Sequence, residues 1–160
     1  MTSSRTLEEN REIANEALAR FSSSPLLHLI DGELVPSSTS LTFENISPID
    51  QMSLGQVAAG GPSEIALAAD AAANAFDGWV SLSGGERKKI LHRVADLIVE
   101  RADEIATIES VDTGQPKRFM SSAAIRGAEN FRYFADAAPA ALDGDAMPTS
   151  TQLQYSTRRA

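Results

Sequence analysis

A short glycine-containing stretch offers the most direct chemistry in the sequence. Residues 82–89 are LSGGERKK, in which Ser83 and two glycines stand just before a run with helical spacing. Backbone N–H groups at a helix N-terminus can bind a phosphate, so the stretch suggests nucleotide binding. Ser83 and Glu86 also form the pattern S-x-x-E, in which the two residues cap a helix reciprocally. Phosphate binding and helix capping therefore compete as explanations of the same residues.

Other parts of the sequence favour the helix cap. The stretch resembles the signature motif of ATP-binding-cassette ATPases, but such an ATPase also needs a loop of the form G-x-x-x-x-G-K-[ST]. The nearest glycine pairs, at 60–61 and 84–85, have no Lys-Ser or Lys-Thr at the required offset. We therefore interpret residues 82–89 as the start of a helix, with Gly84 and Gly85 letting the chain turn into it.

Composition excludes several other classes of function. The chain has 160 residues, 42% of them hydrophobic and 22% charged, as in ordinary globular domains. A formal net charge of −8 argues against nucleic acid as a partner, because phosphate neutralisation needs clustered Lys and Arg. Cysteine is absent, which excludes disulfides and a Cys nucleophile in these residues. No apolar run approaches the ~20 residues of a membrane span and no signal peptide is visible, so we predict a cytoplasmic location without a membrane partner.

One hairpin, several short strands and a terminal strand pair are predicted. Asp31-Gly32 separates two apolar runs, which is a strong hairpin signal. Alternating residues predict strands near 41–46 and 54–58. Residues 152–158 alternate as well, which predicts a half-buried terminal strand, with Gly144 and Pro148 as turn residues before it.

Helical spacing accounts for most of the remaining sequence. A helix over 6–21 begins with the capping pair Thr6 and Glu9, and a second begins at Pro62. An unbroken apolar stripe predicts one helix of about seven turns from Ser83 to Gly114. A last long helix is expected at about 121–138, with Phe131, Tyr133 and Phe134 near its end as core residues instead of part of a substrate pocket.

A longer series of residues carries a family resemblance. Its members are Trp79, Leu82, Glu86-Arg87, Ile90-Leu91, Ala95-Asp96, Glu109 and the run DTGQP at 112–116, together with IDGELV at 30–35, NFRYFAD at 130–136 and YSTRR at 155–159. Their order and spacing over about residues 27–160 resemble the N-terminal segment of the NAD(P)-dependent aldehyde dehydrogenase superfamily. Gln115, where the family usually has Lys, and Leu34, where an aromatic residue is common, depart from its pattern.

The resemblance implies an α/β fold with short antiparallel strands, three long helices and a terminal oligomerisation strand. It divides the chain into an N-terminal extension helix and linker at 1–26, the first part of a nucleotide-binding domain at 27–138, and the start of an oligomerisation arm at 139–160. The nucleotide-binding domain is then incomplete. Its helices are consequently expected to expose apolar faces that would pack on the missing strands.

The implied activity is the oxidation of an aldehyde to an acid with NAD or NADP. Members of the family attack the aldehyde with a Cys thiolate and hydrolyse the resulting thioester with a Glu-activated water, which is covalent catalysis. Those groups lie, in the family, beyond the residues present in this sequence. We therefore expect no catalytic and no cofactor-binding residue in this chain, weak NAD binding at most, and no activity of the chain alone.

Two hypotheses about function follow from that expectation. In the first, the chain is the N-terminal portion of a homo-oligomeric aldehyde dehydrogenase that acts on a small-molecule aldehyde. In the second, it is a truncated, non-catalytic module that only self-associates through its terminal strand.

The resemblance also assigns a substrate residue. The stretch IRGAENFRYFAD is similar to the branch that oxidises carboxylate-bearing semialdehydes, such as hydroxymuconic semialdehydes, in which an Arg at the position of Arg126 reaches the substrate entrance. A guanidinium suits this task because its planar fork binds a carboxylate with two hydrogen bonds. The alternative is an exposed helix Arg that is solvated or paired with Glu129.

A metal site is the last assignment. Asp112 matches a position that helps to hold a monovalent cation in many family members, together with backbone carbonyls at Asn45 and Ile46. Hard cations prefer such oxygen ligands. The alternative is a helix-terminal carboxylate that faces water. His28 and His92 lack any ligand spacing and are expected at the surface or in packing.

Overall fold

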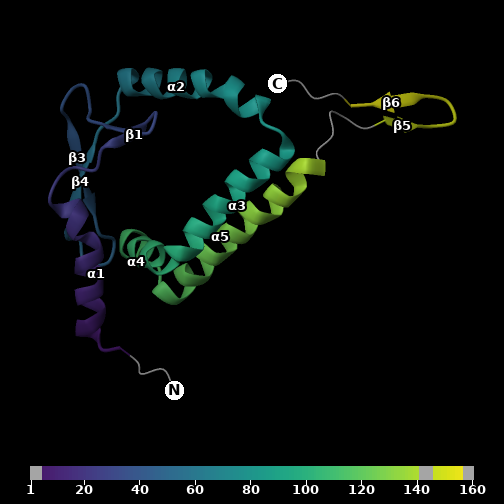
Figure 1. Ribbon diagram of the computed structural model, residues 1–160. Coiled ribbons are helices and arrows are strands. Elements are labelled where there is room, and N and C mark those ends of the chain that lie inside the picture. Colours follow the sequence, from purple (N-terminus) through teal and green to yellow (C-terminus); the bar gives the residue numbers. More distant parts are fainter. Residues whose placement is uncertain (1–4, 141–145, 157–160) are drawn as a thin grey trace.

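The computed structural model of the chain describes residues 5–140 and 146–156, and it combines helices with two-stranded antiparallel sheets (Figure 1). The elements in chain order are α1 (Leu7–Ser22), β1 (His28–Ile30), β2 (Glu33–Val35), β3 (Thr42–Ile46), β4 (Ser53–Ala58), α2 (Pro62–Ser81), α3 (Gly84–Glu100), α4 (Ala102–Thr113), α5 (Lys117–Ala137), the 3-10 turn η1 (Ala138–Ala140), β5 (Ala146–Pro148) and β6 (Leu153–Tyr155). The mixture of helices and short antiparallel strands confirms the predicted α/β class.

The first hairpin forms as its turn residues predict. Asp31 and Gly32 both have positive φ, 52° and 79°, as the tight turn between twisted antiparallel strands requires. Strands β3 and β4 pair next, with an irregularity in register between Asn45 and Ile46. Gly55, opposite Asn45, has φ 131°, a value that residues with a side chain rarely adopt.

The segment before the first hairpin joins the β3–β4 sheet. The Leu26 N–H donates to the Gln56 carbonyl at 2.8 Å, and the Ala58 N–H donates to the Leu26 carbonyl at 2.9 Å. Helix α1 precedes this segment and packs against β4 and α4. The extension helix is therefore held to the body by its own packing and by backbone hydrogen bonds of the segment that follows it.

The two predicted capping boxes are present. At α1, the Glu9 carboxylate accepts from the Thr6 N–H at 2.6 Å, and the Thr6 hydroxyl accepts from the Glu9 N–H at 3.2 Å. At α3, the Glu86 carboxylate accepts from the Ser83 N–H at 2.8 Å, while the Ser83 hydroxyl accepts from the Glu86 N–H at 3.2 Å. The N-terminus of α3 is thus capped by its own residues, as interpreted from the sequence.

Close packing between two elements, and not the predicted turn, explains why residue 84 is a glycine. A Cβ at this position would lie 2.7 Å from both the Ala138 carbonyl oxygen and the Pro139 Cα. Both neighbours are backbone atoms of η1, so neither could move aside cheaply. The glycine therefore permits the close approach of α3 to η1.

The prediction of one helix from Ser83 to Gly114 was wrong. Arg101, with φ −104° and ψ 16°, ends α3 and begins α4. Its guanidinium donates to both carboxylate oxygens of Glu104, at 2.8 and 3.1 Å, which stabilises the break. The apolar period continues across Arg101, so the spacing of residues gave no sign of the break. Helix α5 also begins at Lys117, directly after Pro116, instead of at about 121.

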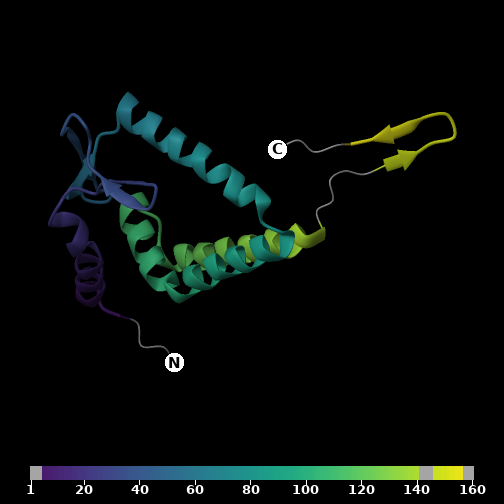
Figure 2. The same cartoon turned by 45° about the horizontal axis from the view of Figure 1, so that its top comes forward.

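The core lies where α5 packs against α3 and α4, and α3 and α5 run side by side (Figures 1 and 2). Small side chains allow the close contact, since Ala95, Ala106, Ala128 and Ala135 are all fully buried. Ion pairs cross the same seam: Lys88 and His92 both contact Asp136, at 2.8 and 2.9 Å. Arg132 binds Asp96 at 2.9 Å. His92, which the sequence left isolated, is therefore part of a cross-helix pair.

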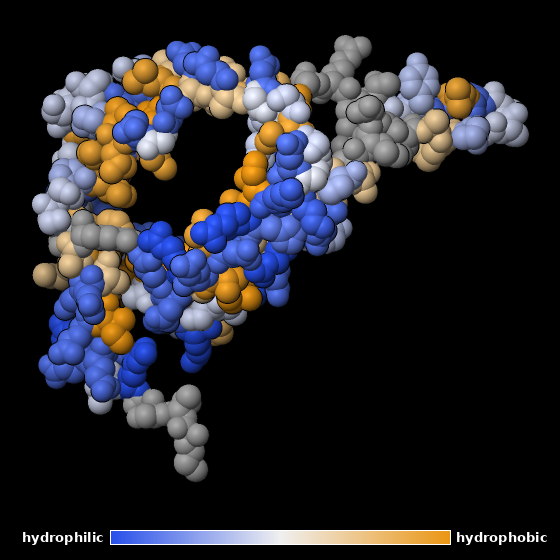
Figure 3. Space-filling model, in the orientation of Figure 1, coloured by the Kyte–Doolittle hydropathy of each residue, from blue (hydrophilic) through white to orange (hydrophobic). Residues whose placement is uncertain are grey.

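Helix α2 differs from the other core helices because little packs against it. Within Pro62–Ser81 only Glu64 is buried, while Ile65, Phe76 and Trp79 are 69%, 48% and 41% exposed. Figure 3 shows an opening between α2 and the rest of this face, with apolar residues along part of its rim. This confirms the expectation that apolar helix faces are exposed.

The last hairpin stands away from the helices (Figures 1 and 2). Strands β5 and β6 pair from Ala146–Tyr155 to Pro148–Leu153, which confirms the predicted terminal strand pair. Pro148 lies in β5 and not in the turn, and all six strand residues are exposed instead of half-buried. Thr157 and Arg158, which were assigned to the same strand, lie outside the described residues. None of the described helices is both long and apolar enough to cross a membrane.

Candidate functional site

The residues of the predicted cation site come together at one point, where the end of β3 meets the end of α4. The Asn45 side-chain amide donates to Asp112 Oδ1 at 2.7 Å. Gly114 terminates α4 with φ 75°, and a Cβ there would lie 3.2 Å from Pro48 Cγ. Because the helix ends in this left-handed conformation against the loop after β3, Asp112 is placed beside Asn45. Sequence positions 67 residues apart are thus joined by a single hydrogen bond.

The polar groups at this point can be compared with those expected for a monovalent cation. The Asp112 carboxylate lies beside Asn45, next to the place where the β3–β4 register is irregular. Oxygen ligands are those that hard cations prefer. Among the described residues no group of three or more His, Cys, Asp or Glu could hold a metal ion. A cation here would therefore depend on carbonyl oxygens and a single carboxylate, which suits a low charge.

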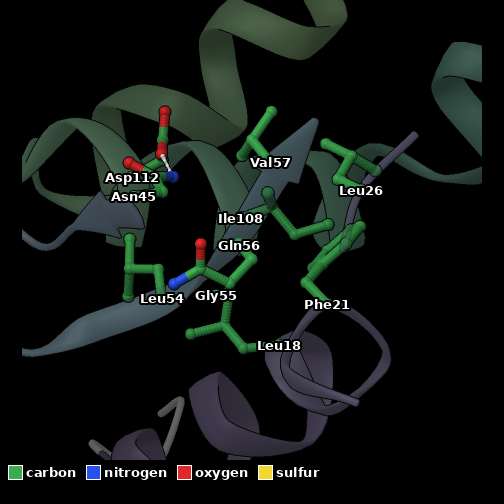
Figure 4. Close-up of a pocket in the computed structure, with 10 residues that line it drawn as sticks. All are labelled: Leu18, Phe21, Leu26, Asn45, Leu54, Gly55, Gln56, Val57, Ile108 and Asp112. Atoms are coloured by element: carbon green, nitrogen blue, oxygen red, sulfur yellow. Dashed lines mark hydrogen bonds between the residues drawn. The ribbon is translucent and has the colours of Figure 1, made fainter. Parts of the chain in front are cut away.

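An apolar pocket of about 280 Å³ opens next to this pair (Figure 4). Its walls come from α1, from the Leu26 segment, from β4 and from α4, and Asn45 and Asp112 lie together at one side of it. The lining residues are Leu18, Phe21, Leu26, Asn45, Leu54, Gly55, Gln56, Val57, Ile108 and Asp112. The pocket was not predicted from the sequence, because α1 was treated as an extension that lies outside the family resemblance.

Arg126 is not part of that group. It lies exposed on α5, it does not line the pocket, and no hydrogen bond or ion pair joins its guanidinium to Glu129 or to any other side chain in the part of the chain that is described. Arg132, further along the same helix, is instead engaged by Asp96. The Arg126 guanidinium therefore has no side-chain partner among the described residues, whereas Arg132 pairs with Asp96.

A buried carboxylate in the first turn, Glu64, holds the N-terminus of α2 in place. Glu64 accepts hydrogen bonds from the Gly61 N–H at 2.7 Å and from the Ser38 N–H at 2.9 Å. These bonds favour the charged form and lower the pKa of Glu64 to about 2, with the Gly61 bond as the largest cause. The bond to Gly61 follows from the local cap pattern. The bond to Ser38 links residues far apart in sequence, so no local pattern reveals it.

Aromatic residues near the end of α5 were expected in the core. In this chain Tyr133 and Phe134 contact each other edge to face, with ring centroids 5.3 Å apart, and both are exposed along with Phe131. The core expectation was wrong for the chain as it stands. His28 has an Nε2 atom that is buried without a hydrogen-bond partner among the described residues, close to Gly60.

Residues 34–160 match the aldehyde dehydrogenase family. The chain is 44% identical over 135 residues to aldehyde dehydrogenase 1 of Tanacetum cinerariifolium, a match that covers 81% of this chain and 26% of that protein. It is 39% identical over 138 residues to 2-hydroxymuconic semialdehyde dehydrogenase of Pseudomonas sp. strain CF600, covering 82% of this chain and 28% of that enzyme.

Solved structures show the same relationship. The crystal structure of HpcC from Thermus thermophilus superposes with a TM-score of 0.81 at 38% identity, covering 88% of this chain and 27% of that one. PnpE in complex with nicotinamide adenine dinucleotide superposes with a TM-score of 0.73 at 33% identity, covering 82% and 27%. The chain thus spans little more than a quarter of the length of the relatives and structures that it matches.

Proposed function

The chain belongs to the aldehyde dehydrogenase family, as its N-terminal segment, and from this we propose that it serves an NAD(P)-dependent enzyme that oxidises an aldehyde to the corresponding acid. The observation that carries the proposal is the family match over residues 34–160, supported by 39% identity to a semialdehyde dehydrogenase. A relative crystallised with nicotinamide adenine dinucleotide supports that cofactor for the complete enzyme.

The division of labour within such an enzyme follows from the residues present. The chain contains no cysteine, so the thiolate that attacks the aldehyde must come from a part of the family fold that these residues do not span. The cofactor accepts the hydride in the complete enzyme, and no residue of this chain is assigned to hold it. The chain's own contribution is to shape the substrate entrance and to support the fold.

Arg126 is proposed to bind the substrate carboxylate. Its guanidinium is exposed on α5 and has no side-chain partner within the described residues, so binding a carboxylate would break no existing pair. A planar fork recognises a carboxylate through two parallel hydrogen bonds. We therefore assign the substrate to semialdehydes that carry a carboxylate, which agrees with the relative that acts on 2-hydroxymuconic semialdehyde.

Asp112, Asn45 and Ile46 are proposed to hold a monovalent cation. The 2.7 Å hydrogen bond from the Asn45 amide fixes one oxygen of the Asp112 carboxylate, and the irregular register beside it places the Asn45–Ile46 backbone at the same point. A cation there would tie the end of β3 to the end of α4. Its contribution would be to the stability of the fold, since it would join two elements at a point to which Arg126 does not contribute.

A second candidate function is favoured by the terminal hairpin. Strands β5 and β6 project from the helices with every strand residue exposed (Figure 2). Leu153 and Tyr155 are large apolar side chains in that position, and open strand edges are readily paired by another chain. In this alternative the chain is a non-catalytic module that associates through the hairpin.

A chimera tests both candidates. Residues 27–160 would replace the matching segment of the Pseudomonas 2-hydroxymuconic semialdehyde dehydrogenase, and NADH formation would be followed with a carboxylate-bearing semialdehyde and with a neutral aldehyde of similar size. We expect turnover of the first substrate. An assembled, folded chimera that forms no NADH would contradict the enzymatic proposal and favour the non-catalytic module.

The Arg126→Ala variant of the chimera tests the substrate class. Loss of a charge-assisted hydrogen bond weakens binding by about 1.5–3 kcal/mol, or roughly ten- to a hundredfold, so KM should rise by that factor for the carboxylate substrate alone. Arg93→Ala is the matched control, because Arg93 is also an exposed helix arginine. An equal rise in KM for both substrates would assign Arg126 a structural role.

A further inference from the structure

We propose that the pocket between α1, β4 and α4 binds a small apolar molecule with a cationic head group, of the class of short primary alkylamines. The proposal rests on the shape and charge of the pocket and is independent of the proposed catalytic function, and the ammonium group would take the place at Asp112 proposed above for a monovalent cation. Most of its walls are aliphatic or aromatic, and Asp112 is the one charged residue among those that line it.

The size of the pocket sets the size of the ligand. Its volume is about 280 Å³, which is near the lower end of the roughly 300–1,000 Å³ typical of small-molecule sites. A cavity of about 150 Å³ already accepts benzene when its walls are apolar. A single ring or an unbranched chain of about four to eight carbons would therefore fit among the apolar side chains of Leu18, Phe21, Val57 and Ile108 (Figure 4).

The charge at the edge of the pocket determines which head group the ligand carries. The Asp112 carboxylate is exposed, and one of its oxygens, Oδ1, accepts from Asn45 at 2.7 Å. An ammonium group can bind this carboxylate while its alkyl chain remains in the apolar pocket. A ligand carboxylate would be repelled at the same place, and the net charge of −8 adds to that repulsion.

Ligand binding would also stabilise the position of α1, because this helix forms one wall of the pocket. Leu18 and Phe21 belong to a helix that precedes residues 34–160, the part that matches the family. A ligand in the pocket would contact α1, β4 and α4 at once, and a ligand that binds only the folded arrangement stabilises it. The site thus joins the extension helix to the family fold through a small molecule.

Calorimetric titration of the chain with propyl-, butyl-, pentyl- and hexylamine tests the proposal, with hexanol and hexanoate as matched probes. Each added methylene should tighten binding by about fourfold, as expected for burial of a CH₂ group. Hexanoate should bind at least tenfold more weakly than hexylamine. Equal affinity of hexylamine, hexanol and hexanoate would overturn the assignment of a cationic ligand.

Two substitutions distinguish the contribution of the ligand's head group from that of its alkyl chain. Asp112→Asn keeps an acceptor for Asn45 and should weaken hexylamine three- to tenfold while leaving hexanol unchanged, because an exposed carboxylate is partly screened. Glu109→Gln removes an exposed carboxylate on the same helix outside the pocket and should leave the affinities for hexylamine and hexanol unchanged. Unchanged amine affinity in Asp112→Asn would overturn the proposal.

Leu18→Trp should fill the pocket and abolish binding of every chain length. Because this variant could fail to fold, methyl NMR on the unmodified chain provides a second measurement. Hexylamine should shift the signals of Leu18, Val57 and Ile108, and not those of Leu67 on α2 or Leu97 on α3. Shifts confined to Leu67 or Leu97 would place the ligand elsewhere and contradict the proposal.

Discussion

Helices α2 and α5 have similar lengths and both carry apolar stripes, but they meet different surroundings. Four residues of α5 are buried, Met120, Ala124, Ala128 and Ala135, and ion pairs from Asp136 and Arg132 reach across to α3. In α2 the one buried residue is Glu64, and the large apolar side chains face solvent. Amphipathic spacing thus predicts which face of a helix seeks burial, whereas the presence of a partner depends on the rest of the chain.

The comparison also shows what holds each helix in place. Helix α5 is fixed along its length by alanine packing, while α2 is fastened at its N-terminus, where Glu64 binds Ser38 and Gly61. Within this chain, which spans little more than a quarter of the length of its relatives, α5 is packed against other elements and α2 is largely exposed. Substitutions should therefore have different effects in the two regions.

The largest difference in stability is expected between alanine substitutions at two glycines. Gly84→Ala should destabilise the chain by about 1–3 kcal/mol, the range for overpacking, because the new Cβ would lie 2.7 Å from backbone atoms of Ala138 and Pro139. Gly78→Ala in α2 should stabilise it by up to about 1 kcal/mol, because a Cβ there meets nothing within 4 Å. Urea unfolding followed by circular dichroism measures both.

The same two variants can contradict the difference in packing between α2 and α5. If Gly78→Ala destabilises the chain as much as Gly84→Ala, α2 packs against something in solution that the structure leaves open. A concentration-dependent loss for Gly78→Ala would identify that partner as a second copy of the chain.

Local sequence signals predicted the ends of elements well. Thr6 with Glu9, Ser83 with Glu86, and Asp31-Gly32 all depend on contacts within a few residues, so their patterns were sufficient. The break at Arg101 was missed because its energetics lie in backbone conformation and a Glu104 pair, while the apolar period continues through it. The packing of α3 against η1 through Gly84 could not be predicted, because no short pattern records a contact between residues 84 and 138.

An intermediate effect is expected at the fastening point of α2. Since hydrogen bonds lower the pKa of Glu64 from an ordinary 4.5 to about 2, the charged form favours the folded state. Its contribution should be complete above pH 4.5 and lost as the pH falls from 4.5 to about 2. The wild-type chain should therefore be more stable than Glu64→Gln at pH 7, and the two should converge near pH 2.

Urea unfolding at pH 7, 4.5 and 2.5 measures this convergence. Glu44→Gln, which removes an exposed carboxylate from β3, controls for the loss of one charge. A constant difference between wild type and Glu64→Gln at all three pH values would show that the carboxylate's charge does not fasten α2.

The smallest effect is expected on the covered side of the comparison, at Asp136. Hydrogen bonds from Lys88, and then from His92, lower the pKa of Asp136 below its ordinary 3.8. The contribution should therefore be present above pH 3.8 and disappear as the pH falls through the lowered value. Because the carboxylate is 59% exposed, solvent and salt screen it.

Asp136→Asn should accordingly lower the unfolding midpoint slightly at pH 7 and low salt, and much less at 1 M salt. A shift as large as that of Gly84→Ala, or one that salt leaves unchanged, would mean that charge and not alanine packing fixes α5 on α3.

The candidate site was predictable only in part. The juxtaposition of Asn45 and Asp112 came from resemblance to a family, since residues 67 positions apart share no local pattern. Gly114 was predicted as a helix end, and its left-handed φ is what aims the end of α4 at Pro48. The pocket beside the pair needed the tertiary position of α1, which helical spacing alone does not contain.

The terminal hairpin has a consequence for the kinetics of assembly. Its turn is closed within four residues, because the Thr149 N–H and hydroxyl both donate to the Gln152 carbonyl and the Thr149 hydroxyl accepts from the Gln152 N–H. Such short-range loops close in nanoseconds to microseconds, long before distant helices find one another. In the second candidate function, an arm that is already shaped when two chains collide loses less conformational entropy on docking. The rate of that association can then be set by diffusion and orientation.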